Sequence, residues 1–221
     1  MTDSLAAADL SQEYQQRFGG SVEYRQKVWT ILGNWFATYI PTSGHVLDLG
    51  CGWGEFINNA TAAKKFAMDL NPDAPNHLNP GVTFIGQDCS LPWTVAPESL
   101  DAVFSSNFFE HLPDKEALTR TLQHAYTALK PGGRIVCMGP NVAVVPGIYW
   151  DFYDHYLPLT EKSMAEGLRL RGFTIERVEK RFLPYTMSEG RQLPTIFLKA
   201  YLRLPVAWRF AGAQFLVVAR K

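Results

Sequence analysis

Residues 48–54 read DLGCGWG, a segment in which glycine occupies every second position from Gly50 to Gly54. The apolar run at 45–49 that leads into it is typical of a buried parallel strand. Glycine lets the backbone turn sharply and lets a ligand approach the main chain closely, and a helix that begins at Glu55 would complete the unit. A strand, a glycine turn and a helix in this order predict a nucleoside-binding loop.

The spacing of these glycines argues against a dinucleotide site. A dinucleotide fingerprint needs a third glycine three residues after the second. Counted from Gly50 and Gly52, that position is Glu55, and counted from Gly52 and Gly54 it is Ile57. A loop that cradles a pyrophosphate is therefore disfavoured.

Acidic residues end the next two predicted strands. Residues 65–69 read KFAMD and residues 82–88 read VTFIGQD. Asp69 is placed where a carboxylate can accept hydrogen bonds from both ribose hydroxyls. Each acid also has a structural explanation, because Asp69 precedes a turn-forming Asn-Pro pair and Asp88 can cap the segment that follows. Two acids at successive strand ends after a glycine loop favour a ligand site.

These segments, in this order, resemble the class I S-adenosylmethionine-dependent methyltransferases. Residues 101–112 (DAVFSSNFFEHL) are similar to the fourth strand of that family and its following loop, and residues 129–140 (LKPGGRIVCMGP) to its glycine turn and fifth strand. The resemblance covers residues 44–140 and implies that S-adenosylmethionine binds and leaves as S-adenosylhomocysteine. In the family, the acid at the position of Asp88 faces the adenine amino group. The implied cofactor-binding residues are Asp48, Gly50, Gly52, Gly54, Asp69, Leu70, Asp88, Cys89 and Asn107.

Alternating strands and helices predict an α/β fold with a doubly wound parallel sheet. The resemblance implies a seven-stranded, mostly parallel, Rossmann-like sheet with an antiparallel last strand. We expect a helix at 21–40, a second from 113 to a stop at Pro131–Gly133, and a third from Thr160 to a stop at Gly172. Residues 71–81 should form only a short or broken helix. Two late strands are expected at 173–183 and 214–220.

A chain of 221 residues, 47% of them hydrophobic, can bury the core of one domain. We expect a single methyltransferase domain over 1–221. It divides into an N-terminal helical cap (1–43), a cofactor-binding core (44–140), and an acceptor-side segment with the last strands (141–221).

Composition limits the partners and the compartment. Lys plus Arg equals Asp plus Glu, at 21 each, so no global positive field favours nucleic acid. Cys51, Cys89 and Cys137 have no spacing that suggests disulfides or zinc, which indicates a reducing cytoplasm. No run of about eighteen uncharged apolar residues predicts a membrane span, and the N-terminus lacks the pattern of a signal peptide. A monomer and a homodimer both remain open.

Methyl transfer from a sulfonium depends mainly on positioning, and it needs a base only when the acceptor loses a proton. His111 and His155 are the candidate catalytic residues, because histidine titrates near neutrality. The alternative for His111 is that the EHL segment orients the loop and the tail of the cofactor. His155 is the preferred base, with Asp151 or Asp154 as its orienting partner.

Binding a metal ion is the other function that His155 and the acidic residues near it could have. Asp151, Asp154, His155 and Glu110 are potential ligands, but no fixed ligand spacing demands an ion, and we expect none.

The segment 149–156 contains five aromatic residues where the resembled family builds its acceptor pocket. They could form a lid over the acceptor or pack on the edge of the sheet. In the N-terminal segment, Tyr14, Tyr24 and Arg25 could close over the cofactor or simply dock a helix.

Residues 194–211 form an apolar stretch that carries Lys199, Arg203 and Arg209. We expect a helix that is buried against the sheet or a dimer partner. A peripheral contact with an anionic membrane is the alternative. Residues 149–163 and 214–221 resemble bacterial methyltransferases that are associated with surface-polysaccharide assembly.

The predicted function is in-line methyl transfer from S-adenosylmethionine to a small-molecule or glycan acceptor, at oxygen. Two alternatives remain: an N- or C-methyltransferase of a natural product, and a noncatalytic S-adenosylmethionine-binding module. The intact set of Asp48, Asp69 and Asp88 argues against the noncatalytic alternative.

Overall fold

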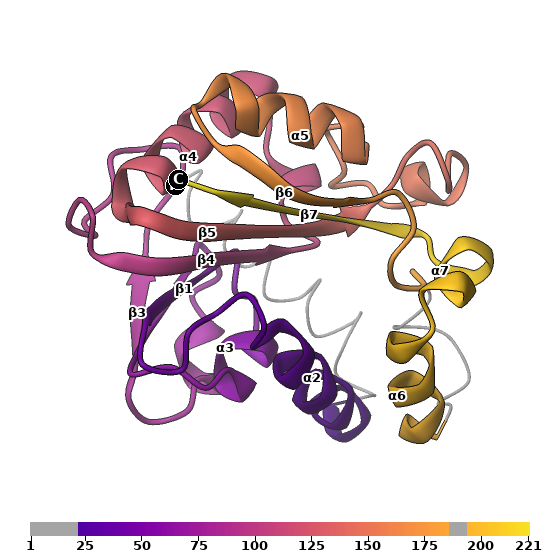
Figure 1. The fold of residues 1–221 in the computed structure, drawn as a ribbon. Coiled ribbons are helices and arrows are strands. Elements are labelled where there is room, and N and C mark those ends of the chain that lie inside the picture. The colour runs from indigo at the N-terminus through magenta and orange to yellow at the C-terminus, as the bar shows by residue number, and fades with distance from the viewer. Residues whose placement is uncertain (1–21, 186–193) are drawn as a thin grey trace.

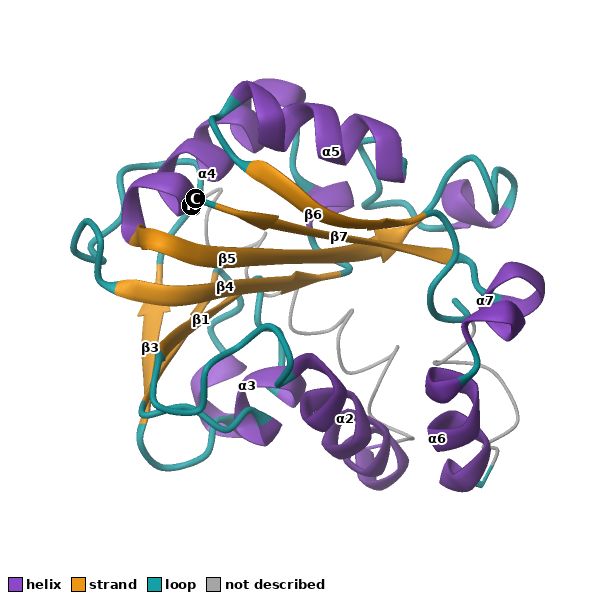
Figure 2. Ribbon diagram, in the orientation of Figure 1, coloured by secondary structure: helices purple, strands orange, loops and turns teal. Residues whose placement is uncertain are grey.

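The computed structural model describes residues 22–185 and 194–221 and contains one seven-stranded sheet (Figures 1 and 2). The strand order is β3-β2-β1-β4-β5-β7-β6. β7 runs antiparallel to both of its neighbours, and the other pairs are parallel. The predicted fold class is therefore confirmed. The strands are β1 (His45–Leu49), β2 (Lys64–Asp69), β3 (Val82–Gly86), β4 (Leu100–Ser106), β5 (Leu129–Pro140), β6 (Thr174–Glu179) and β7 (Gln214–Arg220).

Helices cover both faces of the sheet (Figure 1). α2 (Val22–Phe36) and α3 (Glu55–Asn59) pack on one face, and α4 (Lys115–Ala128) and α5 (Glu161–Leu170) pack on the other. Alternate residues of each central strand point to opposite faces, so Val46 belongs to one core and Leu47 to the other.

The chain reverses its direction of travel across the sheet between β1 and β4. From β1 it proceeds outward to β2 and β3, and it then returns to β4 on the other side of β1. In an open α/β sheet, ligands bind beyond the carboxyl ends of the strands at such a point. The glycine loop after β1 and the loop after β4 therefore flank the expected site.

Three helices end earlier than the sequence analysis predicts. α2 ends at Phe36 rather than residue 40, and α5 ends at Leu170, before Gly172. α4 ends at Ala128, so the prediction that Pro131–Gly133 stops it is wrong. Leu129 instead pairs with Leu100 and begins β5, while Gly132 and Gly133 bond the backbone of Lys221 at the C-terminus. A partner distant in sequence thus decides this boundary.

The remaining elements largely match the prediction. Residues 71–81 contain only the short 3-10 helix η2 (Ala74–His77), and β7 has the predicted bounds. The strand expected at 173–183 is shorter, Thr174–Glu179. Thr160 and Ser163 form a reciprocal capping box at the start of α5. No helix of the described residues is long and apolar enough to cross a membrane.

The stretch 194–211 does not form one helix buried against the sheet, so that part of the prediction is wrong, and burial against a dimer partner stays a prediction. Pro205, which has no N–H to donate, divides the stretch into α6 (Thr195–Arg203) and α7 (Pro205–Ala211). Leu202 and Trp208 are buried, but most of the other apolar side chains are exposed.

Phe104 of β4 organises the face on which α2 and α3 pack. It is fully buried, and it lies between the rings of Phe36 and Phe56, with centroid distances of 4.9 and 3.6 Å. Phe104→Ala should lower the free energy of unfolding by about 3–5 kcal/mol in a urea titration, because it opens a cavity under both helices. Phe210→Ala, at a side chain that is 83% exposed, is the control and should change it by less than about 0.5 kcal/mol. Equal midpoints for the two variants would contradict this role.

Candidate active site

The three glycines after β1 all adopt a left-handed backbone. The φ angles of Gly50, Gly52 and Gly54 are 71°, 52° and 73°, values that other residues rarely tolerate. Packing adds a second restriction at Gly50, where a Cβ would lie 2.1 Å from the ring of Phe108. The loop after β1 and the loop after β4 therefore touch, and only glycine permits the contact.

Asp69, at the end of β2, is bonded to the glycine loop. One carboxylate oxygen accepts the Gly52 N–H at 2.7 Å, and the other accepts the Asn71 N–H at 2.8 Å. Burial raises the pKa of Asp69, and these backbone N–H groups oppose that effect. Each carboxylate oxygen has further acceptor capacity, so the geometry leaves Asp69 able to bind hydroxyls as well.

Asp48 is a buried carboxyl within β1. Burial raises its pKa well above the usual range, and the negative charge of Glu55 adds to this effect. The backbone N–H of Ile57 donates to Asp48 and so links β1 to the first turn of α3. Arg25 of α2 in turn donates to Glu55, with an Nε–Oε1 distance of 2.9 Å. Arg25 thus docks one helix on another, while Tyr14 lies outside the described residues.

The loops after β2, β3 and β4 hold the other predicted cofactor-binding residues. Leu70 is 56% exposed, directly after Asp69. Asp88 accepts the Ser90 N–H at 2.7 Å, a local bond to the segment that follows, where the sequence analysis considered a cap. Burial raises the pKa of Cys89 to about 11, so its thiol remains protonated at neutral pH. Asn107 has a φ of 50°, and its buried Oδ1 has no hydrogen-bond partner in the described part of the chain.

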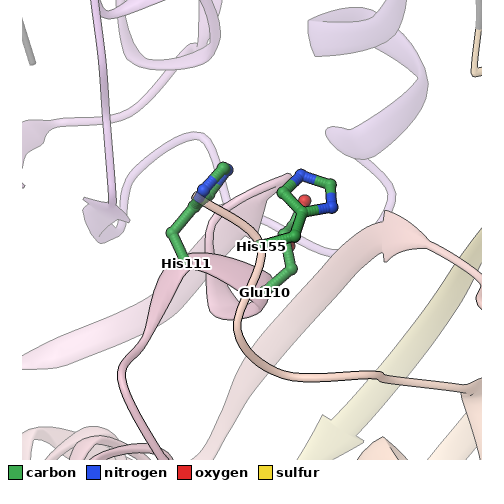
Figure 3. Close-up of side chains that lie close together, drawn as sticks. All are labelled: Glu110, His111 and His155. Atoms are coloured by element: carbon green, nitrogen blue, oxygen red, sulfur yellow. The ribbon is translucent and has the colours of Figure 1, made fainter. Parts of the chain in front are cut away.

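Two loops bring Glu110, His111 and His155 together (Figure 3). Glu110 and His111 belong to the 3-10 helix η3 (Phe109–His111) after β4, and His155 follows the 3-10 helix η4 (Ile148–Asp151) after β5. One nitrogen or oxygen atom from each of the three lies within 4.8 Å of the others. The backbone carbonyl of Glu110 accepts the N–H of Tyr156 at 2.8 Å, so main-chain bonds hold the two loops side by side.

The imidazole rings have different surroundings. Nδ1 of His111 lies 2.9 Å from a carboxylate oxygen of Asp154. His155 is almost fully buried, and its ring stacks on Phe152 at a centroid distance of 5.0 Å. The two imidazoles meet edge to face at 4.9 Å. Asp154 therefore pairs with His111, a contact that the sequence analysis did not anticipate. The orienting role of Asp151 or Asp154 toward His155 stays a prediction.

Glu110 and His111 have shifted pKa values in this cluster. Burial raises the pKa of Glu110 to about 7, although the charge of His111 opposes the shift. For His111, burial lowers the pKa, but the bond to Asp154 and the negative charge of Glu110 outweigh it, and the net change is upward. Within the described residues, Oε1 of Glu110 has no hydrogen-bond partner. The cluster can therefore hold or release a proton near neutral pH.

The sequence analysis considered Glu110 as a metal ligand and as part of the orienting EHL segment, and missed it as an acid. The position of Glu110 beside His111 was the signal in the sequence that it could act as an acid. Its burial, which shifts its pKa, cannot be read from the sequence. Two ligands of one zinc ion lie no more than about 4.4 Å apart, since each bond is about 2.0–2.2 Å. The spread of 4.8 Å in the cluster does not by itself require an ion, and the absence of a metal stays a prediction.

The aromatic segment 149–156 divides into two groups. Tyr149 is fully buried, and its hydroxyl donates to the carbonyl of Leu157, which agrees with packing on the sheet edge. Tyr153 is 95% exposed, and Trp150 and Tyr156 are each 54% exposed. Only the second group is available to cover an acceptor.

A family model and a relative of known activity both identify a methyltransferase. Residues 21–178 match the model of a family described as a methyltransferase domain. The demethylmenaquinone methyltransferase of Lactiplantibacillus plantarum is 23% identical, and the match covers 73% of this chain and 71% of that protein.

Solved structures share the fold. A SAM-dependent methyltransferase from Archaeoglobus fulgidus superposes with a TM-score of 0.66 at 20% identity, over 96% of this chain and 99% of its own. A possible histamine N-methyltransferase from Thermotoga maritima gives a TM-score of 0.67 at 16% identity, over 95% and 98%. At these identities the likeness shows the fold alone.

The buried carboxyl of Glu110 predicts a pH-dependent stability. The unfolded chain ionises Glu110 near pH 4.5, whereas the folded chain keeps the proton up to about pH 7, so this group lowers stability as the pH rises through that window. Glu110→Gln lacks this loss. The free energy of unfolding of the variant minus that of wild type should increase by about 2 kcal/mol between pH 5 and pH 8, as measured by urea titrations. Glu166→Gln, at an exposed position of α5, is the control and should give no such trend. If the stabilities of Glu110→Gln and wild type changed in parallel with pH, folding would not raise the pKa of Glu110, and the prediction would be wrong.

Proposed function

The chain belongs to the class I S-adenosylmethionine-dependent methyltransferases, and we propose that it methylates an oxygen atom of a small molecule or glycan. S-Adenosylmethionine is the cosubstrate of this family, and S-adenosylhomocysteine is the product. The observation that carries the proposed transfer to oxygen is the cluster of Glu110, His111 and His155 beyond the carboxyl ends of β4 and β5. A hydroxyl acceptor loses a proton during transfer, so it is the acceptor that gives such a cluster a function.

The proposed cofactor site lies where the loops after β1, β2, β3 and β4 meet. The bond from Gly52 to Asp69 supports it, because it holds the ribose-binding carboxylate against the glycine loop. Leu70 presents an exposed apolar side chain that suits the face of an adenine ring. The buried Oδ1 of Asn107 suits an ammonium or amino group, since it has acceptor capacity and no partner in the described chain. The full proposed set is Asp48, Gly50, Gly52, Gly54, Asp69, Leu70, Asp88, Cys89 and Asn107.

The proposed mechanism is an in-line displacement. The new bond joins the acceptor oxygen to the methyl carbon, and the carbon–sulfur bond of the sulfonium breaks. His155 takes the hydroxyl proton, with the carboxyl of Glu110 beside it. His111, fixed by Asp154, positions the loop between the cofactor and the acceptor. Burial of His155 and Glu110 excludes water from the proton transfer.

Several observations support the proposed acceptor and the proposed cellular compartment. Equal numbers of acidic and basic residues favour a small molecule or glycan over nucleic acid. The resemblance of residues 149–163 and 214–221 to polysaccharide-associated methyltransferases favours a glycan. All three cysteines are free and buried, which agrees with the proposed cytoplasmic location. A monomer and a homodimer both remain open. Labelled methyl transfer to candidate acceptors tests the proposal, because the carbon-13 shift of the product distinguishes O-methyl from N- or C-methyl groups.

Asp69 provides the test of the cofactor site. Asp69→Ala should weaken S-adenosylmethionine binding by about 1.5–3 kcal/mol in calorimetry, because charged hydrogen bonds to the ribose are lost. Asp73→Ala, in the neighbouring turn, removes a partly exposed carboxylate that bonds Asn76 and His77, and it should bind as wild type does. Unchanged affinity in Asp69→Ala would refute the assigned role.

His155 provides the test of the base. His155→Ala should slow single-turnover methyl transfer by about 10²–10⁴-fold, the usual contribution of a general base, with nearly unchanged cofactor affinity. The fall in rate at acidic pH, which reports protonation of the base, should disappear. His111→Ala should weaken the cofactor or acceptor complex but leave that fall in place. A full rate in His155→Ala, with the acidic fall intact, would make His155 structural.

A further inference from the structure

The outer side of α6 and α7 exposes an unusual amount of apolar surface. Phe210 is 83% exposed and Ile196 is 64% exposed, although this is the last helical segment before a buried strand. Exposed aromatic residues in and after η4 add to it. We define the docking surface as Ile196, Phe197, Val206 and Phe210 of α6 and α7, together with Trp150 of η4 and Tyr153 shortly after it.

The inner side of the same helices is fixed to the domain. The ring nitrogen of Trp208, a buried residue, donates to the carbonyl of Tyr201 at 2.8 Å. The hydroxyl of Tyr201 donates to the carbonyl of Phe182 at 2.6 Å, and the guanidinium of Arg177 lies over the Trp208 ring. The exposed residues are therefore the outward side of an anchored pair of helices.

Positive charge accompanies this apolar surface. Lys199, Arg203 and Arg209 lie on α6 and α7, and residues 194–213 contain no Asp or Glu. Among the described residues, none of these three cations takes part in an ion pair. Of the two acids near Tyr153, Asp154 is paired with His111, so Asp151 is the one left exposed. In a chain of zero net charge, this is a local excess of cations.

The docking surface lies at the end of the sheet that carries the site. Pro140, the last residue of β5, pairs with Gln214, the first residue of β7, and the N–H of Asn141 donates to Ala213 at 3.0 Å. The segment that leads to η4 and the segment that follows α7 therefore start from neighbouring strand ends, and both lie at the same end of the sheet in Figures 1 and 2. His155 follows η4 and Tyr153 along the chain.

We propose that this docking surface binds the face of an anionic lipid bilayer. Exposed aromatic and aliphatic side chains beside lysine and arginine are the combination that enters the lipid interface, where the chains bury and the cations meet anionic headgroups. A membrane-bound protein would have the end of its sheet with His155 facing the lipid. The inference that this serves a lipid-linked acceptor rests on the proposed function, but the binding itself does not.

Flotation with vesicles of phosphatidylcholine and phosphatidylglycerol tests the proposal. Wild type should float with these vesicles, should bind vesicles of pure phosphatidylcholine much less, and should be released by salt. The triple variant Lys199→Gln, Arg203→Gln, Arg209→Gln should lose roughly a hundredfold in partition coefficient, since each basic residue near the surface contributes about fivefold. Phe210→Ser with Val206→Ser should lose roughly tenfold or more.

Matched variants on α5 are the controls. Lys162→Gln with Arg169→Gln removes exposed cations, and Leu170→Ser removes an apolar side chain that is 68% exposed, so both should float as wild type does. Tm and S-adenosylmethionine affinity show that each variant is folded. Equal flotation of all variants, or no binding of wild type to anionic vesicles, would overturn the proposal. A wild-type dimer in sedimentation that Phe210→Ser dissociates, without vesicle binding, would assign the surface to a second copy instead. Because flotation requires no methyl transfer, its failure is distinct from a failure of the proposed function.

Discussion

The hydrogen bond from the Gly52 N–H to Asp69 is the contact on which the arrangement of the site depends. It forms only because the left-handed glycine loop turns back over the end of β1, so that its N–H groups face the end of β2. It also places a buried carboxylate near Asp48, whose pKa rises through burial and through the charges of Glu55 and Asp69. A region that collects buried carboxyl groups in this way favours a positively charged ligand, because a nearby cation lowers the cost of ionising them. S-Adenosylmethionine, with its sulfonium and ammonium groups, is such a ligand.

A second set of contacts joins the cofactor side of the site to the acceptor side. The loop after β4 begins at Asn107 and contains Glu110, whose carbonyl accepts N–H groups from the loop after β5. His111 is held by Asp154 of that second loop. Movement of either loop therefore displaces the other, so the side chains proposed to contact the cofactor and the acceptor are positioned by one unit. This coupling, together with the bond to Asp154, supports the positioning role proposed for His111.

The sequence was sufficient for features that depend on neighbours along the chain or on a recurring order of elements. The glycine turn, the acids at the ends of β2 and β3 and the antiparallel β7 belong to this group, the last through a resemblance. Features that depend on distant partners were missed. The end of α4 is decided by the pairing of Leu129 with Leu100, and the pairing of Asp154 with His111 joins loops from different strands. The exposure of α6 and α7 likewise depends on what the domain covers, which periodicity does not reveal.

The proposed reaction moves a positive charge across the site without changing the total. The sulfonium becomes a neutral thioether when the methyl group leaves, and the hydroxyl proton appears on His155. In a buried site, such a charge is unfavourable unless opposite charges lie close to where it arrives. Glu110 is adjacent to His155, and its pKa of about 7 lets it meet an imidazolium as a carboxylate or share the proton itself. In the proposed reaction, a carboxyl that is costly to ionise in the resting protein thus becomes favourable to ionise as the imidazolium forms.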